Sequence, residues 1–284
     1  MSGLQAEGEM MFDCELVGKI GSMALVRRDE YEIDYNVFSR VGAELVPGHI
    51  WVSSGAVEIG RIDYMRRNKG AEIGPSETGI NACYAAQGQM ILMENYRKFI
   101  SPFYSVRQVL VEHQHFNDPE KGKFIRHLLL GCAKQNAIPI VNYNDSVSNE
   151  ETRKMELFNL SRQQEKVVEC IDNDETASEI AMLVKSKYLL ILTSSSGLLR
   201  DPSDAQSLIT DVSGKDVYEL LENVENLKNY CNGASRKGAN GMRAKLEYIS
   251  GPLKNGTTVI IGSAGHRIKD LISGAAERTI FGLR

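Results

Sequence analysis

The sequence predicts an α/β protein, a three-layer α/β/α sandwich with a mainly parallel central sheet. Short apolar runs alternate with amphipathic stretches along the 284 residues, the pattern of strands joined by helical crossovers. The clearest strand is the run YLLILT at 188–193, and the clearest helix is the Ala-, Met- and Leu-rich stretch 80–100. Polar residues gather directly after several expected strands, where parallel sheets bind their ligands.

The remaining elements follow from apolar spacing and from turn residues. We expect strands at 15–19, 50–53, 105–111, 138–143, 166–170, 188–193, 257–261 and 279–281. We expect helices at 35–45, 80–100, 120–135, 175–185, 217–224 and 241–250, with one more after the turn at Ser54-Gly55. The stretch 146–165 is polar, charged and without a clear period.

Composition and charge exclude several classes of function. The chain is 42% hydrophobic and 25% charged, with a net charge of -4 and a pI of about 5.8, so no basic field favours nucleic acid or an anionic membrane. The first eleven residues lack the features of a signal peptide, and no apolar run is long enough to span a membrane. The cysteines contain no C-x-x-C pair, which favours a reducing, cytoplasmic setting; they are Cys14, Cys83, Cys132, Cys170 and Cys231.

Two glycine-bearing turns have the pattern of phosphate-binding sites. GKIGS at 18–22 places Lys19 at a strand end before Gly21 and Ser22, and GANGMRAK at 238–245 opens a helix that carries Lys245. Backbone N–H groups in such turns can cradle a phosphate while a lysine neutralises it. The structural alternative is an ordinary tight turn with a solvated lysine for 18–22, and a helix C-cap with linker glycines for 238–245. Neither turn matches the P-loop or Rossmann pattern.

Three further polar groups follow strands. WVSSGAV at 51–57 runs from a strand through Ser54 into a helix, whose N-terminus suits an anion or needs Ser54 only as a cap. PIVNYND at 139–145 ends on Asp145. Asp172-Asn173-Asp174 precedes a helix, where the carboxylates could hold Mg²⁺ or organise lysines, and we expect Asp174 to cap that helix as well. His113 and His115 have no third ligand nearby in sequence, so we expect no metal site there.

From about residue 16 to residue 262 these motifs resemble the amino-acid kinase family, and within it the glutamate 5-kinases. KIGS at 19–22, VSSGAV at 52–57, AAQGQ at 85–89, PIVNYND at 139–145, DND at 172–174 and GANGMRAKL at 238–246 are similar to that family's motifs in the same order, as is 190–202. The resemblance implies an ATP- and Mg²⁺-dependent kinase that phosphorylates a small acidic acceptor, with the γ-carboxylate of L-glutamate favoured. It also implies an acceptor lobe at 1–172 and a nucleotide lobe at 173–284 within one continuous domain.

Site residues carry over from the resemblance motif by motif. Lys19 and Lys245 would be catalytic and would flank the transferred phosphoryl group, and Asp172 would hold both lysines. The acceptor would bind to Ser54, Gly55, Ala56, Asp145 and Asn173. The nucleotide would bind to Gly21, Ser22, Thr193, Ser194, Ala239, Asn240, Gly241, Met242 and Lys245.

Departures from the family pattern keep other functions open. Tyr143 replaces a Glu, Ser194 replaces an Asp, and Ala239-Asn240 replace Thr-Gly. The alternatives are a kinase of the same fold acting on UMP or another small acceptor, and a catalytically silent nucleotide-binding regulator. The long segment 146–169 is expected to be a lid that reads the acceptor through Arg153 or Arg162, or a solvated excursion without a role. The apolar surface of 80–100 predicts a homo-oligomer.

Overall fold

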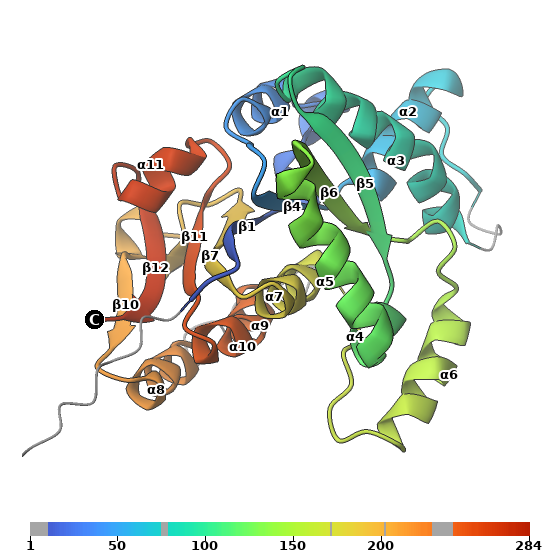
Figure 1. The fold of residues 1–284 in the computed structure, drawn as a ribbon. Helices are drawn as coiled ribbons and strands as arrows, with labels where there is room; N and C mark the ends of the chain where they lie inside the picture. Colours follow the sequence, from blue (N-terminus) through green and yellow to red (C-terminus); the bar gives the residue numbers. More distant parts are fainter. Residues whose placement is uncertain (1–10, 75–78, 171, 202, 229–240) are drawn as a thin grey trace, which may run out of the picture.

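The protein, described here by a computed structural model, is built around one eight-stranded sheet with the strand order β10-β12-β11-β7-β1-β4-β6-β5 (Figure 1). The structure describes residues 11–74, 79–170, 172–201, 203–228 and 241–284. Every neighbouring pair in this sheet is parallel except β11 and β12, which confirms the predicted mainly parallel sheet. The strands are β1 (Cys14–Ile20), β4 (His49–Ser53), β5 (Ser105–Val111), β6 (Ala137–Tyr143), β7 (Ser186–Thr193), β10 (Asp211–Gly214), β11 (Thr258–Ser263) and β12 (Arg278–Leu283).

Helices cover both faces of the sheet, as expected for three layers (Figure 1). One face packs against α1 (Tyr35–Gly42), α2 (Ala56–Arg67), α3 (Ile80–Phe99) and α11 (Ile268–Ser273). The other packs against α5 (Pro119–Lys134), α7 (Asn173–Leu183), α8 (Val217–Lys228), α9 (Gly241–Tyr248) and α10 (Ser250–Lys254). Two short hairpins, β2 (Val26–Arg27) with β3 (Glu32–Ile33) and β8 (Leu198–Leu199) with β9 (Leu208–Ile209), lie outside the main sheet.

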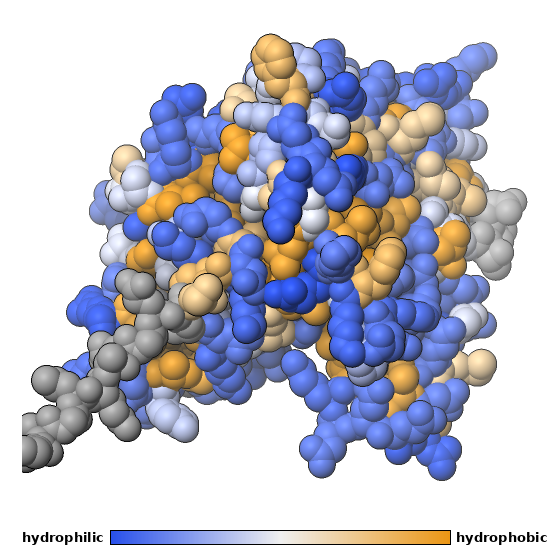
Figure 2. All heavy atoms as spheres, viewed as in Figure 1, coloured by the Kyte–Doolittle hydropathy of each residue, from blue (hydrophilic) through white to orange (hydrophobic). Residues whose placement is uncertain are grey.

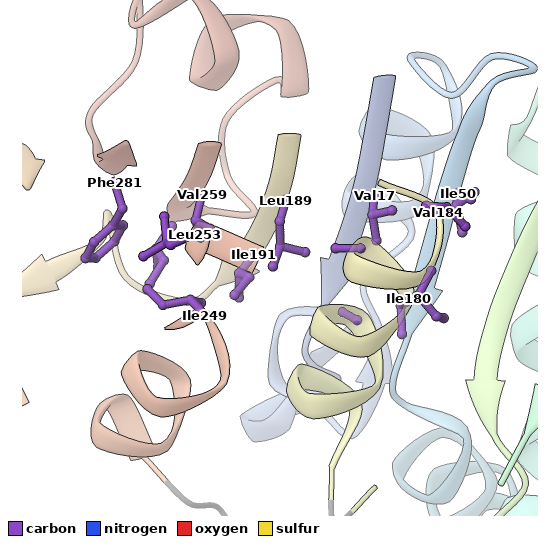
Figure 3. Close-up of a cluster of buried hydrophobic side chains, with 14 of the residues drawn as sticks. Val17, Ile50, Ile180, Val184, Leu189, Ile191, Ile249, Leu253, Val259 and Phe281 are labelled. Atoms are coloured by element: carbon purple, nitrogen blue, oxygen red, sulfur yellow. The ribbon is translucent and has the colours of Figure 1, made fainter. Parts of the chain in front are cut away.

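The alternation of side chains along each strand divides the core between the two faces. On β7, Leu189 and Ile191 join one buried cluster, whereas Leu190 and Leu192 join the other, because successive side chains of a strand point to opposite faces. Figure 3 shows the first cluster, where Val17 on β1 lies beside Ile180 on α7, and Val259 on β11 lies beside Leu253 on α10. Strands buried on both faces read as continuous apolar runs, which is why YLLILT was recognisable in the sequence.

The order of the strands predicts a ligand crevice beside β1. The strands that precede residue 150 lie on one side of β1 and those that follow it lie on the other, so chain connections leave β1 in opposite directions. In open parallel sheets such a switch point opens a crevice at the carboxyl ends of the strands. The carboxyl ends of β1, β4 and β7 therefore bring residues 19–22, 53–56 and 193–194 to one edge.

Helices α2 and α3 cross at two glycines. A Cβ added at Gly60 would lie 1.8 Å from the carbonyl oxygen of Tyr84, and one added at Gly88 would lie 1.8 Å from that of Ala56. Both distances are far below van der Waals contact, so the helices approach closely only because these positions lack a side chain. Gly88 lies in the AAQGQ motif, and the crossing holds α2 with its N-terminus at the crevice.

We expect Gly88→Ala to destabilise the fold by about 1–3 kcal/mol, because the added methyl group must push the two helix backbones apart. Urea denaturation measures this change. Gly131→Ala on α5 is the matched control: its new Cβ would meet nothing closer than 3.7 Å, so it should be neutral or stabilise by up to about 1 kcal/mol. Equal unfolding free energies for wild type and Gly88→Ala would contradict the close crossing.

The expected strand at 166–170 is wrong. This segment has no strand partner; its backbone bonds instead to the side chain of Asn117, which accepts from the Val168 N–H at 2.9 Å and donates to the Val168 carbonyl at 2.7 Å. Val168 and Cys170 are buried against Tyr143, so their apolar character reflects packing rather than pairing. The preceding segment, which showed no sequence period, forms α6 (Glu150–Ser161), which projects from the body in Figure 1.

The surface offered by α3 is smaller than the sequence suggested. Tyr96 is fully buried, and Ile91, Met93 and Phe99 pack partly against the core, whereas Met90 is 72% exposed. Homo-oligomer formation through this helix therefore stays a prediction. Within the part of the chain that the structure describes, none of the helices is both long enough and apolar enough to cross a membrane.

Candidate active site

Two lysines from opposite halves of the chain meet on one buried carboxylate. The Lys19 ammonium on β1 lies 2.7 Å from one oxygen of Asp174, and the Lys245 ammonium on α9 lies 2.6 Å from the other. The exposed fractions of the three side chains are 7%, 20% and 6% for Lys19, Lys245 and Asp174. Two ammonium groups and one carboxylate leave one net positive charge. An ammonium has three N–H donors, so both lysines keep donors for an anionic ligand.

The expectation that Asp172 holds both lysines is wrong, because Asp174 contacts them and Asp172 takes the capping role expected of Asp174. Asp172 is the N-cap of α7, and its carboxylate accepts from the backbone N–H groups of Asp174 at 2.8 Å and Glu175 at 3.0 Å. Those bonds satisfy two free donors at the helix start. Asp174, which we expected to cap the helix as well as to organise a cation, lies in the first turn and only contacts the lysines of β1 and α9.

The environments of these carboxyl groups separate their pKa values. Burial alone would raise the pKa of Asp174, but the ammonium groups of Lys19 and Lys245 outweigh it and hold this pKa below its usual range. Burial and the neighbouring Asp174 charge raise the pKa of Asp172, against the opposing effects of the cap bonds and Lys19. Asp174 is therefore the firmly ionised member, and it fixes two cations in place.

The turn after β1 is shaped for a close ligand. A Cβ added at Gly21 would lie 3.6 Å from the Lys19 ammonium, so the glycine keeps the space beside this cation open. The Gly21 N–H donates to the Leu192 carbonyl at 3.3 Å, which ties the turn to the end of β7. Thr193 follows there and bonds to Ser195, while Ser194 is exposed. The expected nucleotide residues Gly21, Ser22, Thr193 and Ser194 thus share one edge.

The next strand end carries Ser54 into α2. Ser54 donates its N–H to the Ile20 carbonyl at 3.0 Å, so the turn is pinned to β1. Gly55 has a φ of 109°, a left-handed conformation that favours glycine, and Ala56 begins the helix buried. The N-terminus of α2 has no side-chain cap, so its first N–H groups remain available beside Ser54.

A neutral hydrogen-bond chain joins Ser54 to three other elements. The Asn173 side-chain amide donates to the Ser54 hydroxyl at 3.1 Å and to the Asn142 carbonyl oxygen at 2.9 Å. Asn142 in turn donates to Gln89 at 2.8 Å. Sequence reasoning placed Ser54 and Asn173 in the site but missed Asn142 and Gln89. The sequence did contain a signal for each: Asn142 is a polar residue near the end of the apolar strand in PIVNYND, and Gln89 is a polar residue of the apolar helix in AAQGQ.

Asp145 lies outside this hydrogen-bond chain, two residues after Tyr143, which stands where the family pattern has a Glu. Burial raises the pKa of Asp145 to about 6, and the positive charge of Arg153 on α6 opposes that rise. Tyr143, two residues earlier, joins the network because its backbone N–H donates to the Asn173 side chain at 3.3 Å. The burial of Asp145 thus disfavours its charged form.

The second glycine turn falls partly outside the described residues. Ala239 and Asn240 lie outside them, as does Cys231, whereas Gly241 and Met242 begin α9. Lys245 lies one turn into this helix and reaches Asp174. Within the described ranges no cluster of three or more His, Cys, Asp or Glu side chains could hold a metal ion.

The sequence of this chain matches a known family and several known proteins. The amino acid kinase family matches residues 16–263. Glutamate 5-kinase from Kosmotoga olearia is 26% identical over 272 residues, covering 93% of this chain and 67% of that protein. The enzyme from Gloeobacter violaceus is 30% identical over 241 residues, covering 83% and 58%, and that from Clostridium perfringens is 27% identical over 266 residues, covering 92% and 89%. The chain therefore spans about two thirds or less of the length of several of these relatives.

Solved structures confirm the fold. Carbamate kinase from Giardia lamblia bound to AMP-PNP superposes with a TM-score of 0.58 at 14% identity, covering 95% of this chain and 98% of that one. UMP kinase from Ureaplasma parvum gives a TM-score of 0.52 at 11% identity, covering 96% and 97%. At these identities the likeness concerns the fold alone.

Proposed function

The chain belongs to the amino acid kinase family, and we propose that it transfers the γ-phosphoryl group of MgATP to a small acidic acceptor, with the γ-carboxylate of L-glutamate as the first candidate. The observation that carries this proposal is the pair of lysines, Lys19 and Lys245, fixed by Asp174 beside the Ser54–Asn173 hydrogen bond. A phosphoryl group placed between the lysines would meet an acceptor held at Ser54.

Phosphoryl transfer asks the protein mainly for alignment and charge neutralisation. The acceptor carboxylate oxygen attacks the γ-phosphorus, a new O–P bond forms, the bond to the β–γ bridging oxygen breaks, and ADP leaves with that electron pair. A carboxylate is already ionised, so the step needs no general base. Lys19 and Lys245 would neutralise the phosphoryl oxygens as charge moves toward ADP. Asp174 would keep both lysines charged and in place.

The sheet suggests how the two substrates divide the crevice. Ser54, Asp145 and Asn173 would bind the acceptor on the side of β4 and β6, mostly within 1–172. The edge after β7 and the N-terminus of α9 would bind the nucleotide, within 173–284. Thr193, Gly241 and Met242 would then approach the phosphates through backbone N–H groups. Support for glutamate in particular comes from the curated relatives, which are glutamate 5-kinases.

The test is the chemical nature of the product. With MgATP and L-glutamate we expect ADP release together with an acyl phosphate, which hydroxylamine traps as a hydroxamate. Phosphorylation of UMP would release ADP without any hydroxamate. The panel should contain L-glutamate, L-aspartate, UMP and carbamate, with reactions lacking acceptor as the baseline.

Each result of this panel selects one function. Hydroxamate formed with L-glutamate well above L-aspartate supports the proposal. Rapid ADP release with UMP or carbamate and none with either amino acid would replace the acceptor but keep the kinase. No acceptor-dependent ADP release, with ATP still bound, would favour the silent regulator.

A further inference from the structure

Helix α6 brings one charged side chain inward. Its half-buried residues are Arg153, Leu157 and Leu160, spaced four and three residues apart on one face, while Met155 and Phe158 are more than 60% exposed. Hydrophilic residues dominate the surface around α6 at the lower right of Figure 2, with small hydrophobic patches between them. The half-buried face of α6 thus includes a cation, Arg153, although burying an apolar side chain there would cost less desolvation free energy.

The guanidinium of Arg153 lies within a group of titratable side chains. Its central carbon is 5.9 Å from the centre of the Tyr143 ring, a cation–π distance. Its charge opposes the burial effect on the pKa of Asp145 and of Cys170, and it adds to the burial effect that lowers the pKa of His113. Among the described residues its buried Nε has no hydrogen-bond partner. Tyr143 connects this group to the acceptor network, since its N–H bonds to Asn173.

A second contact fixes the helix over this group. The Glu156 carboxylate, one turn after Arg153, lies 3.2 Å from Nε2 of the buried His113 at the end of β5. Glu112 beside it bonds to the Asn144 side chain at 3.0 Å. The titratable groups that interact with Arg153 are therefore Tyr143 and Asp145 from the β6 side, His113 from the β5 side, and Cys170 from the segment after α6. Glu156, on α6 itself, pairs with His113. Arg162, the other residue expected to read the acceptor, is exposed at the end of α6.

We propose that Arg153 is a positioning residue of the acceptor site: α6 places its guanidinium against Tyr143 and within electrostatic reach of Asp145, so that Asp145 stays ionised and available to the acceptor. This inference rests on the proposed function, which assigns Asp145 to the acceptor. It gives α6 a purpose, because a buried carboxylate without a nearby cation would be largely protonated near neutral pH. It also accounts for Tyr143 in place of the family's Glu, because the Tyr143 ring contacts the Arg153 guanidinium.

The direction of the pH dependence follows from the charges. Wild-type Asp145, with a pKa of about 6, is mostly ionised at pH 7. Without Arg153 its pKa rises further, so the ionised fraction falls most at low pH and recovers above the new pKa. For each unit of that rise the acceptor KM at pH 6 should increase up to about tenfold. The increase should shrink toward pH 9, while kcat at saturating acceptor and the KM for ATP stay within about threefold.

The experiment compares the full chain with Arg153→Met, Arg153→Lys and Lys154→Met between pH 5.5 and 9. Arg153→Lys keeps the charge but loses the planar contact with Tyr143, so it should restore most of the acceptor KM. Lys154, the next residue of α6, is exposed, and Lys154→Met should match wild type at every pH. An acceptor KM for Arg153→Met that is unchanged, or raised equally at all pH values, would overturn the inference.

A measurement without substrate separates this inference from the proposed function. The carboxyl carbon of Asp145, labelled with ¹³C and assigned with Asp145→Asn, reports its titration by NMR. We expect the apparent pKa to rise by about one unit or more in Arg153→Met. That rise in an enzyme inactive toward L-glutamate would support the coupling and overturn glutamate as the acceptor. An unchanged titration would overturn the role of Arg153 whatever the acceptor.

Discussion

Lys19→Met and Lys245→Met are each expected to lower kcat about a hundredfold or more, with the acceptor KM within a few-fold of wild type. Each lysine would meet charge that grows on the phosphoryl and leaving oxygens during the reaction, so its loss is felt more in the transition state than in substrate binding. Loss of one such donor commonly costs two to three orders of magnitude in rate, which is about 2.7–4 kcal/mol of activation free energy. Steady-state kinetics with trapped acyl phosphate measures it.

The control for this experiment is a lysine outside the crevice. Lys187 lies at the beginning of β7 and pairs weakly with Glu15 at 3.5 Å, so Lys187→Met should keep the wild-type rate. Circular dichroism should show that Lys19→Met, whose methionine enters a buried site, remains folded. A kcat within about threefold of wild type in either variant would remove that lysine from the mechanism.

The sequence allowed the sheet and most of its edge residues to be predicted, because strands buried on both faces leave a strong apolar signal. YLLILT gave β7 almost to its residue bounds. The turns after β1 and β4 could be located because Gly21 and Gly55 come soon after apolar strands, and because Lys19 stands near the end of β1. Their meeting in space then followed from a general property of parallel sheets, that the carboxyl ends share one edge.

Helix α6 could not be recognised from its pattern, and the reason is physical. Its inward stripe combines Arg153 with two leucines, and apolar residues also occupy its outer face, so no 3.6-residue period stands out. Asn149, whose side chain caps the helix by accepting from Glu151 and Thr152, was the one local signal. The strand predicted at 166–170 was wrong for the opposite reason: its apolar residues Val168 and Cys170 are buried by packing, without a neighbouring strand.

The wrong assignment of the lysine contacts to Asp172 has a similar cause. Both carboxylates precede or begin the same helix, and either could cap it if the first helical residue moved by two positions. Which one turns toward the lysines depends on where Lys19 and Lys245 arrive from β1 and α9, and that arrangement is tertiary. Local propensity therefore identified the pair but could not assign its members.

The two carboxylates yield the sharpest expected contrast between neighbouring residues. Asp174→Asn keeps the shape of the side chain but removes the charge, and it leaves two ammonium groups facing each other in a mostly buried space. We expect kcat to fall at least a hundredfold, because neither lysine is then held for the phosphoryl group. Removing one member of a buried ion pair also typically destabilises a protein by about 3–5 kcal/mol, and urea denaturation should detect this loss.

Asp172→Ala is the matched variant, and we expect it to lower stability modestly without disturbing the two lysines. It removes the N-cap of α7, which costs about 1 kcal/mol of unfolding free energy, while the contacts of Asp174 with both lysines remain. Because the folded-state pKa of Asp174 is depressed, the stability difference between wild type and Asp174→Asn should be complete above pH of about 4 and vanish as the pH falls through that lower pKa. If Asp172→Ala instead lost the larger share of both rate and stability, Asp172 would be the residue that organises the lysines, and the assignment made from the structure would be wrong.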